Sequence, residues 1–203
     1  MSSAHSSLPD ALRAVLLDPA DATAVQVHGR TKAAVLVPLY EHDGALHGVF
    51  TRRQSDLRRH AGEIAFPGGR CDEADADLIT TALREAEEEI GLPLEAVHVI
   101  GALSPTPTIA TSFGVYPFVG LIETGREWTL SPREVDEVLE LRLGDLRAGS
   151  HRRRLLHRGI PFRSVVYDVG EAALIWGATA RIVGDLLARI EPLLDSSDRT
   201  QAG

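Results

Sequence analysis

The sequence predicts a single α/β (α+β) sandwich, in which helices pack against a mixed β-sheet. Short β-branched and apolar runs, typical of strands, alternate along the chain with amphipathic stretches of helical period. The 203 residues are 44% hydrophobic, which is ample for one core, and no linker rich in Pro, Gly or Ser separates two cores. We expect residues 1–30 to form an N-terminal extension with a short helix, 31–194 the domain, and 195–203 a disordered tail.

The first predicted elements are a helix and a β-hairpin. Residues 8–17 have the pattern of a short helix that ends before Pro19. Residues 32–40 form an apolar, β-branched run that predicts the first strand, and 45–52 is its expected hairpin partner. The turn between them falls on 42–44, which contains Asp and Gly.

Further strands and a closing helix are predicted in the rest of the chain. Residues 63–66 form a brief strand, and 104–114 is a loop because two prolines and several hydroxyl side chains favour turns. The last helix covers 172–194, where apolar residues recur at helical spacing. The remaining expected elements are strands at 97–103, 115–122 and 137–143, a helix start at 131–134, and two strands within 150–169 around a turn at 158–159.

Composition limits the partners and the compartment. The formal net charge of −8 argues against nonspecific binding to nucleic acid, and the longest apolar runs are too short to span a membrane. No basic region followed by an apolar stretch suggests a secretory signal. The single cysteine, Cys71, favours a reducing compartment, so we predict a cytoplasmic protein. Arginines gather in two clusters, which are Arg52, Arg53, Arg58 and Arg59, and Arg152, Arg153 and Arg154.

The stretch from Phe66 to Leu92 predicts a strand, a tight turn and a helix. Pro67 lacks an N–H, and the two glycines after it permit backbone angles closed to other residues. Asp75 or Asp77 is the expected N-cap of the helix, and a glycine before Leu92 is placed as its C-cap. One helix face is apolar and comprises Leu78, Ile79, Ala82, Leu83, Ala86 and Ile90.

Acidic side chains share another face of this helix. Glu85, Glu88 and Glu89 fall within roughly a 100° arc, whereas Glu87 points nearly the opposite way. Three like charges at this spacing repel one another unless a cation lies among them, and oxygen ligands suit Mg²⁺ or Mn²⁺. Arg84 can orient the carboxylates. The alternative is an ordinary solvated acidic face.

The helix resembles the second half of the Nudix box, Gly-x5-Glu-x7-Arg-Glu-U-x-Glu-Glu-x-Gly-U, in which U is a bulky apolar residue. The first half differs, because Asp75 replaces the first glutamate and one extra residue precedes the arginine. The matching residues are Arg84, Glu85, Glu88, Glu89, Gly91 and Leu92.

The run before the box is similar to the signature of the coenzyme A pyrophosphatase branch of the Nudix hydrolases, a branch that tolerates the extra residue. Gln54 departs from that signature, which has serine at its position. The matching residues are Thr51, Arg53, Arg58, Gly62, Phe66, Pro67, Gly68 and Gly69, and Ile64 is conservative.

The resemblance implies a Nudix fold, with a mixed sheet between helices, and a metal-dependent hydrolase. The substrate implied is coenzyme A, cleaved to 4′-phosphopantetheine and adenosine 3′,5′-bisphosphate. Mg²⁺ or Mn²⁺ is the implied cofactor, and a homodimer is left open. By role, the residues are Arg84, Glu85, Glu88 and Glu89 for catalysis; Glu85, Glu88, Glu89 and Gly69 for metal; and Arg53, Arg58, Gly68 and Gly69 for substrate.

Several alternatives stay open from the sequence. The same chemistry can act on ADP-ribose, a dinucleotide or a nucleoside triphosphate, and a non-catalytic nucleotide-binding module is a third hypothesis. The general base is not fixed, since a box glutamate, Glu63 or a glutamate within 134–140 can serve. No Gly-x-Ser-x-Gly elbow, P-loop or His-x3-His pair supports another chemistry.

Overall fold

A computed structural model describes residues 7–27, 31–54, 62–108, 112–157, 160–170 and 173–201. Its centre is a mixed sheet built around β1 (Thr31–His42), which pairs antiparallel with β2 and β4 and parallel with β7. The central strand order is β3-β2-β1-β7-β5, while β4 pairs with β1, β6 with β7 and β8 with β2. The other strands are β2 (Ala45–Arg53), β3 (Ile64–Ala65), β4 (Gly68–Arg70), β5 (His98–Ala102), β6 (Thr106–Pro107), β7 (Phe113–Leu121) and β8 (Val135–Arg142).

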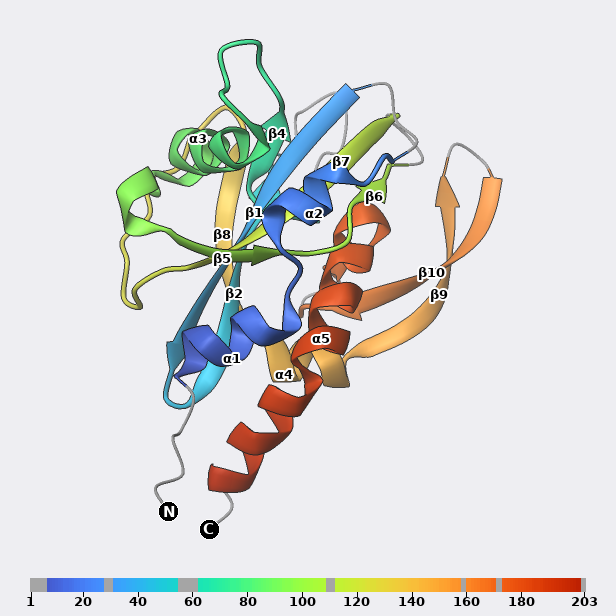
Figure 1. Cartoon of the computed structure of the whole chain (residues 1–203). Helices are drawn as coiled ribbons and strands as arrows, with labels where there is room; N and C mark the ends of the chain where they lie inside the picture. The colour runs from blue at the N-terminus through green and yellow to red at the C-terminus, as the bar shows by residue number, and fades with distance from the viewer. Residues whose placement is uncertain are drawn as a thin grey trace.

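Helices cover both faces of this sheet (Figure 1). Along β1, Ala34 and Leu36 point into the core beneath α3, whereas Val37 and Leu39 point into the core beneath α5 and α1. This alternation follows from the period of two along a strand, and it explains why β1 is apolar on both faces. The helices are α1 (Leu8–Val15), α2 (Pro19–Ala24), α3 (Leu78–Ile90), α4 (Leu143–Ala148) and α5 (Gly177–Gln201), with a 3₁₀ helix η1 (Leu94–Ala96).

A second, three-stranded sheet projects from the body (Figure 1). It contains β9 (Ser150–His157), β10 (Ile160–Asp168) and β11 (Leu174–Ile175), in the order β11-β10-β9. At the root of this sheet Val166 and Tyr167 are buried, and β10 packs against α5 there. The outer part consists of β9 and β10 alone, and we call these two strands the arm below.

The predicted sandwich is confirmed, and so is the first hairpin, whose turn has positive φ at Asp43 and Gly44. The expected helix start at 131–134 is wrong, because these residues form a turn that leads into β8. The short helices α2 and α4 were not predicted. None of the helices in the described ranges has the length and apolarity needed to span a membrane.

Two boundaries also differ from the sequence prediction. The closing helix was expected over 172–194, but α5 begins at Gly177 and continues to Gln201. Residues 195–201, expected as part of a disordered tail, therefore extend the helix. The expected glycine turn at Gly68 is instead the start of a short strand, since β4 pairs with β1 through Val35. The expected turn at 158–159 lies outside the described residues.

Candidate functional site

The helix α3 is capped at both ends by residues the sequence singled out. Asp77 is the N-cap, and its carboxylate accepts a hydrogen bond from the Thr80 N–H at 2.7 Å. Gly91 closes the helix in the left-handed conformation, with φ of 67°. Between these caps, the buried residues Ala82, Ala86 and Ile90 fix the rotation of the helix against the sheet. That rotation turns the Glu85 and Glu89 side of α3 toward β4.

Glu89 is the most enclosed of the three box glutamates, with its side chain only 4% exposed. One carboxylate oxygen accepts the Gly68 N–H at 3.2 Å, and the other lies 3.7 Å from Nη1 of Arg53. Burial raises the pKa of Glu89 to about 8, although Arg53 and the Gly68 N–H oppose the shift. The negative charges of Glu85 and Glu134 raise this pKa further.

The two glycines of β4 allow the backbone to approach its neighbours closely. A Cβ at Gly69 would lie 2.4 Å from Oε2 of Glu85, so any other residue there would force that carboxylate to move. A Cβ at Gly68 would lie 2.4 Å from the Ala34 carbonyl oxygen, and its φ of 154° is also unfavourable for other residues. The strand thus lies directly against the acidic face of α3.

Arg84 connects the acidic side chains to one another. Its guanidinium donates two hydrogen bonds to Asp75, at 2.9 and 3.1 Å, and lies 2.9 Å from Glu85 and 3.2 Å from Glu88. It also donates to the Arg70 carbonyl oxygen on β4 at 3.3 Å. This pairing holds the pKa of the Asp75 carboxyl well below its usual range. Asp75, at the divergent position of the box, therefore positions Arg84.

Glu134 joins the site from a distant segment. The turn before β8 is tied to α3 by the Ser131 N–H, which donates to the Glu89 carbonyl oxygen at 2.9 Å. It is tied to β2 by Gln54, whose backbone N–H donates to the Glu134 carbonyl oxygen and whose side chain donates to Val135. The charge of Glu134 raises the pKa of both Glu85 and Glu89, where burial is the main cause.

The sequence had placed Glu134 only within a range of candidate bases. The sequence Ser131-Pro-Arg-Glu134 resembles a helix start, but the chain forms a turn there. Within the described residues the Glu134 carboxylate has no hydrogen-bond or ion-pair partner, and the residue is exposed. No local signal links this turn to the box, because the contact forms only when β8 pairs with β2.

The structure brings most of the sequence-predicted site residues together. Arg53, Gly68, Gly69, Arg84, Glu85 and Glu89 lie around one junction between α3, β2 and β4, and Glu88 is at its rim with 61% of its side chain exposed. Arg58, expected to bind substrate, lies outside the described residues.

The three box glutamates at this junction each lie beside an arginine. Within the described part of the chain, no three acidic, histidine or cysteine side chains converge as metal ligands would. Glu85 and Glu88 instead share Nη1 of Arg84, and Glu89 lies near Arg53. The donor set is nonetheless made of carboxylate oxygens and one backbone strand, which suits a hard divalent cation. Mutual repulsion among Glu85, Glu89 and Glu134 is what such a cation would relieve.

Comparisons with known proteins identify the family of this chain. A model of the NUDIX domain family matches residues 30–159. An uncharacterized Nudix hydrolase of Citrobacter koseri, NudL, is 40% identical over 171 residues, which cover 81% of this chain and 88% of the relative. The NudL protein of Cronobacter sakazakii is 41% identical over 162 residues, which cover 78% of this chain and 82% of the relative.

Solved structures support the fold alone. A MutT/nudix family protein from Enterococcus faecalis superimposes with a TM-score of 0.54 at 15% identity, over 83% of this chain and 64% of that one. The Nudix hydrolase RenU from M. smegmatis gives a TM-score of 0.50 at 19% identity, over 66% of this chain and 81% of that one. With the family match covering most of the chain and the box residues gathered at one junction, this protein is a member of the Nudix hydrolase family.

Proposed function

We propose that this Nudix hydrolase cleaves the pyrophosphate bond of coenzyme A or a derivative in the presence of Mg²⁺ or Mn²⁺. The products are 4′-phosphopantetheine and adenosine 3′,5′-bisphosphate. The observation that carries the proposal is the continuity between the upstream signature and the box. Arg53 belongs to that signature, and its guanidinium lies 3.7 Å from Glu89 of the box. The residues that resemble the coenzyme A branch thus adjoin the acidic site.

The proposed metal ligands are the carboxylates of Glu85, Glu88 and Glu89 and the backbone of Gly69. The burial of Glu85 and Glu89 and the concentrated negative charge of all three glutamates fit a divalent cation better than a monovalent one. A bound divalent cation supplies charge neutralisation on the phosphate oxygens and lowers the pKa of a coordinated water. The pairing of Asp75 with Arg84 holds Glu85 and Glu88 near each other before any cation enters.

The chain's own residues would orient the substrate and accept the proton. Arg53 is the described arginine closest to Glu89, so we assign it to a substrate phosphate, and the Gly68 N–H points into the same junction. We assign Glu134 as the general base, because its carboxylate has no partner within the described residues and acts electrostatically on both buried glutamates. A water between Glu134 and the scissile phosphate would then be deprotonated as it attacks.

Gln54 does not favour a different substrate. It departs from the coenzyme A signature, but its side chain donates to the Val135 carbonyl oxygen at 3.2 Å and its backbone N–H donates to the Glu134 carbonyl oxygen at 3.0 Å. Its contacts hold the turn that carries Glu134. The loss of box glutamates expected of a binding module is also absent from this sequence, since Glu85, Glu88 and Glu89 are all present.

The test is identification of products. The purified full chain is incubated with coenzyme A, ADP-ribose or a nucleoside triphosphate, each with Mn²⁺ or with EDTA, and the products are resolved by chromatography. We expect Mn²⁺-dependent release of adenosine 3′,5′-bisphosphate from coenzyme A and no release in EDTA. Cleavage of ADP-ribose in preference to coenzyme A would support pyrophosphate hydrolysis by this site but contradict coenzyme A as the substrate. No cleavage of any of the three substrates would favour the non-catalytic nucleotide-binding module.

A further inference from the structure

One face of the arm is both apolar and basic, and the proposed hydrolysis does not use it. In the pairing of β9 with β10, Arg152 lies opposite Val165, Arg154 opposite Arg163, and Leu156 opposite Pro161. Directly opposite residues on antiparallel strands project to the same side, and residues two apart along a strand do as well. These six side chains therefore form a single surface, which we call the arm face.

The arm face is exposed and its charges are unpaired. Leu156 is 73% exposed and Val165 is 40% exposed, and Val25 is the one other large hydrophobic residue exposed to this degree among the described residues. Within the same ranges, the guanidinium groups of Arg152, Arg154 and Arg163 have no hydrogen-bond or ion-pair partner. Exposed apolar side chains among arginines are typical of a surface that another molecule covers.

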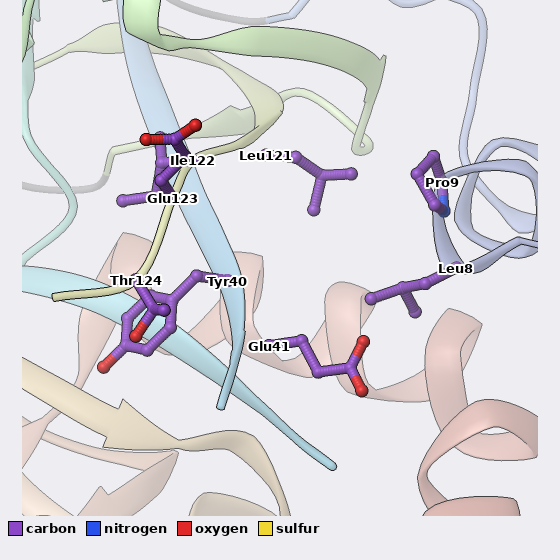
Figure 2. Close-up of a pocket in the computed structure, with 8 residues that line it drawn as sticks. All are labelled: Leu8, Pro9, Tyr40, Glu41, Leu121, Ile122, Glu123 and Thr124. Atoms are coloured by element: carbon purple, nitrogen blue, oxygen red, sulfur yellow. The ribbon is translucent and has the colours of Figure 1, made fainter. Parts of the chain in front are cut away.

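A groove of complementary character lies at the other end of the molecule. It has a volume of about 570 Å³ and opens between the start of α1 and the ends of β1 and β7. Figure 2 shows the apolar side chains of Leu8, Pro9 and Leu121 around the same hollow as the Glu41 carboxylate. Glu123 also lines the groove, with its carboxylate beside Ile122 at the far side. Both glutamates are exposed and, in the described part of the chain, neither has an ion-pair partner. None of the site residues lines this groove.

We propose that the protein is a two-fold dimer in which the arm face of each protomer lies in the groove of the other. Leu156 can pack against the apolar wall of the groove, and the positive charges of Arg152 and Arg154 are opposite in sign to those of Glu41 and Glu123. Each copy carries a net charge of −8, so two copies repel at long range, and the opposite charges of the arm face and the groove attract only at close approach.

The positions of the two surfaces favour a reciprocal contact. In Figure 1 the arm extends from one side of the body, while α1 and the β1–β2 turn, which border the groove, lie at the opposite end. Two protomers placed side by side in opposite directions bring each arm to the other's groove. The contact is then made twice and the assembly is closed, as an isologous dimer requires.

Direct pairing of two β9 edges is a less favourable dimer. Strand β9 is the edge of its sheet, so its outer backbone groups are available to a partner strand. Three consecutive arginines, Arg152 to Arg154, occupy that edge, and antiparallel self-pairing centred on them sets like charges opposite each other. The acidic groove offers the arm charges of opposite sign.

The test is a charge exchange between the two surfaces, read by light scattering coupled to size-exclusion chromatography. The arm variant carries Arg152→Glu and Arg154→Glu, and the groove variant carries Glu41→Arg and Glu123→Arg. We expect the natural chain to have about twice its chain mass of 21.9 kDa at low salt, and each variant alone to have the single-chain mass. An equimolar mixture of the two variants restores the double mass, because each arm then meets a groove of opposite charge.

Controls separate this contact from general effects of charge and folding. Circular dichroism confirms that each variant is folded, and Glu73→Arg, on an exposed loop away from both surfaces, should leave the dimer intact. Leu156→Ser should weaken the dimer without changing any charge. A monomeric natural chain, a dimer that persists in both variants, or a mixture that stays at the single-chain mass would each overturn the proposal.

Discussion

At the scale of single residues, Glu89 is the most enclosed glutamate of the proposed site. It is nearly fully buried, it accepts the N–H of Gly68, and its nearest described cation is Arg53 at 3.7 Å. A carboxylate in that position is costly unless it is protonated or neutralised by a cation. The burial of Glu89 is therefore compatible with the proposed metal site, and it makes the residue sensitive to pH when no cation is bound.

The first prediction concerns turnover. Glu89→Gln preserves the size of the side chain and removes the charge, so we expect kcat for the metal-dependent hydrolysis to fall by about 100-fold or more. Glu87→Gln is the matched control, because Glu87 is exposed on the same helix and makes no contact with the site. Steady-state kinetics with saturating Mn²⁺ measure both. Equal kcat values for Glu89→Gln and Glu87→Gln would show that the Glu89 carboxylate has no role in turnover.

The second prediction concerns the stability of the metal-free protein against pH. The pKa of Glu89 is about 8 in the folded chain and 4.5 in its ordinary state. Because the pKa of Glu89 is higher in the folded chain, the contribution of Glu89 to the free energy of unfolding is complete below about pH 4.5. That contribution is lost as the pH rises through about 8. We therefore expect Glu89→Gln to be more stable relative to the natural chain at pH 8 than at pH 5. Urea unfolding in EDTA at the two pH values tests this, and a difference that stays constant with pH would contradict it.

The third prediction compares two carboxylates that bind the same arginine. Asp75 is 3% exposed and makes two hydrogen bonds to Arg84, whereas Glu88 is 61% exposed. Asp75→Asn should lower the free energy of unfolding by about 2 kcal/mol, because a charge-assisted pair is lost where water does not replace it. Glu88→Gln should cost about 0.5 kcal/mol or less, as exposed pairs do. Similar losses measured by chemical denaturation would show that Asp75 is not the anchor of Arg84.

At the scale of elements, the site depends on how closely β4 lies against α3. The strand pairs with β1 through three residues, and the helix is fixed by its caps and its apolar face. Neither element holds the site alone, since α3 supplies the carboxylates and β4 supplies the backbone that meets them. The absence of a side chain at Gly69 is what allows this contact.

The fourth prediction follows from that contact. A methyl group in Gly69→Ala would lie 2.4 Å from the Glu85 carboxylate, so the carboxylate must move. We expect the affinity for Mn²⁺ to fall by about 10- to 100-fold while the chain remains folded. Gly144→Ala is the matched control, because a Cβ there meets nothing within 4 Å. Titration of Mn²⁺ followed by electron paramagnetic resonance measures the affinity, and an unchanged value for Gly69→Ala would show that Glu85 is not positioned by β4.

At the scale of the whole molecule, local patterns predicted the parts of the fold that are encoded locally. The hairpin of β1 and β2, the caps of α3 and the apolar face of that helix follow from spacing and turn residues over a few positions. The Nudix resemblance then supplied the arrangement around them. The pairing of Arg84 with Asp75 is predictable only in part from the sequence, because the two positions are nine apart and the turn between them sets the distance.

Features that depend on contacts distant in sequence were not predicted. Glu134 reaches the site because β8 pairs with β2, and the sequence around it was interpreted as a helix start. The arm face was visible only as a cluster of arginines until the register of β9 and β10 placed Leu156 and Val165 beside them. The end of α5 was misjudged because the apolar period stops at Leu194 while the helix continues.

The most direct test of the account is the ratio of kcat/KM for coenzyme A to kcat/KM for ADP-ribose, measured on the purified full chain at saturating Mn²⁺. Both substrates contain a pyrophosphate bond, so the box alone predicts no preference, and the ratio isolates the upstream signature that includes Arg53. We expect a ratio of about 100 or more in favour of coenzyme A, with both activities abolished by EDTA. A ratio near one, or below it, would contradict the assignment of coenzyme A as the substrate.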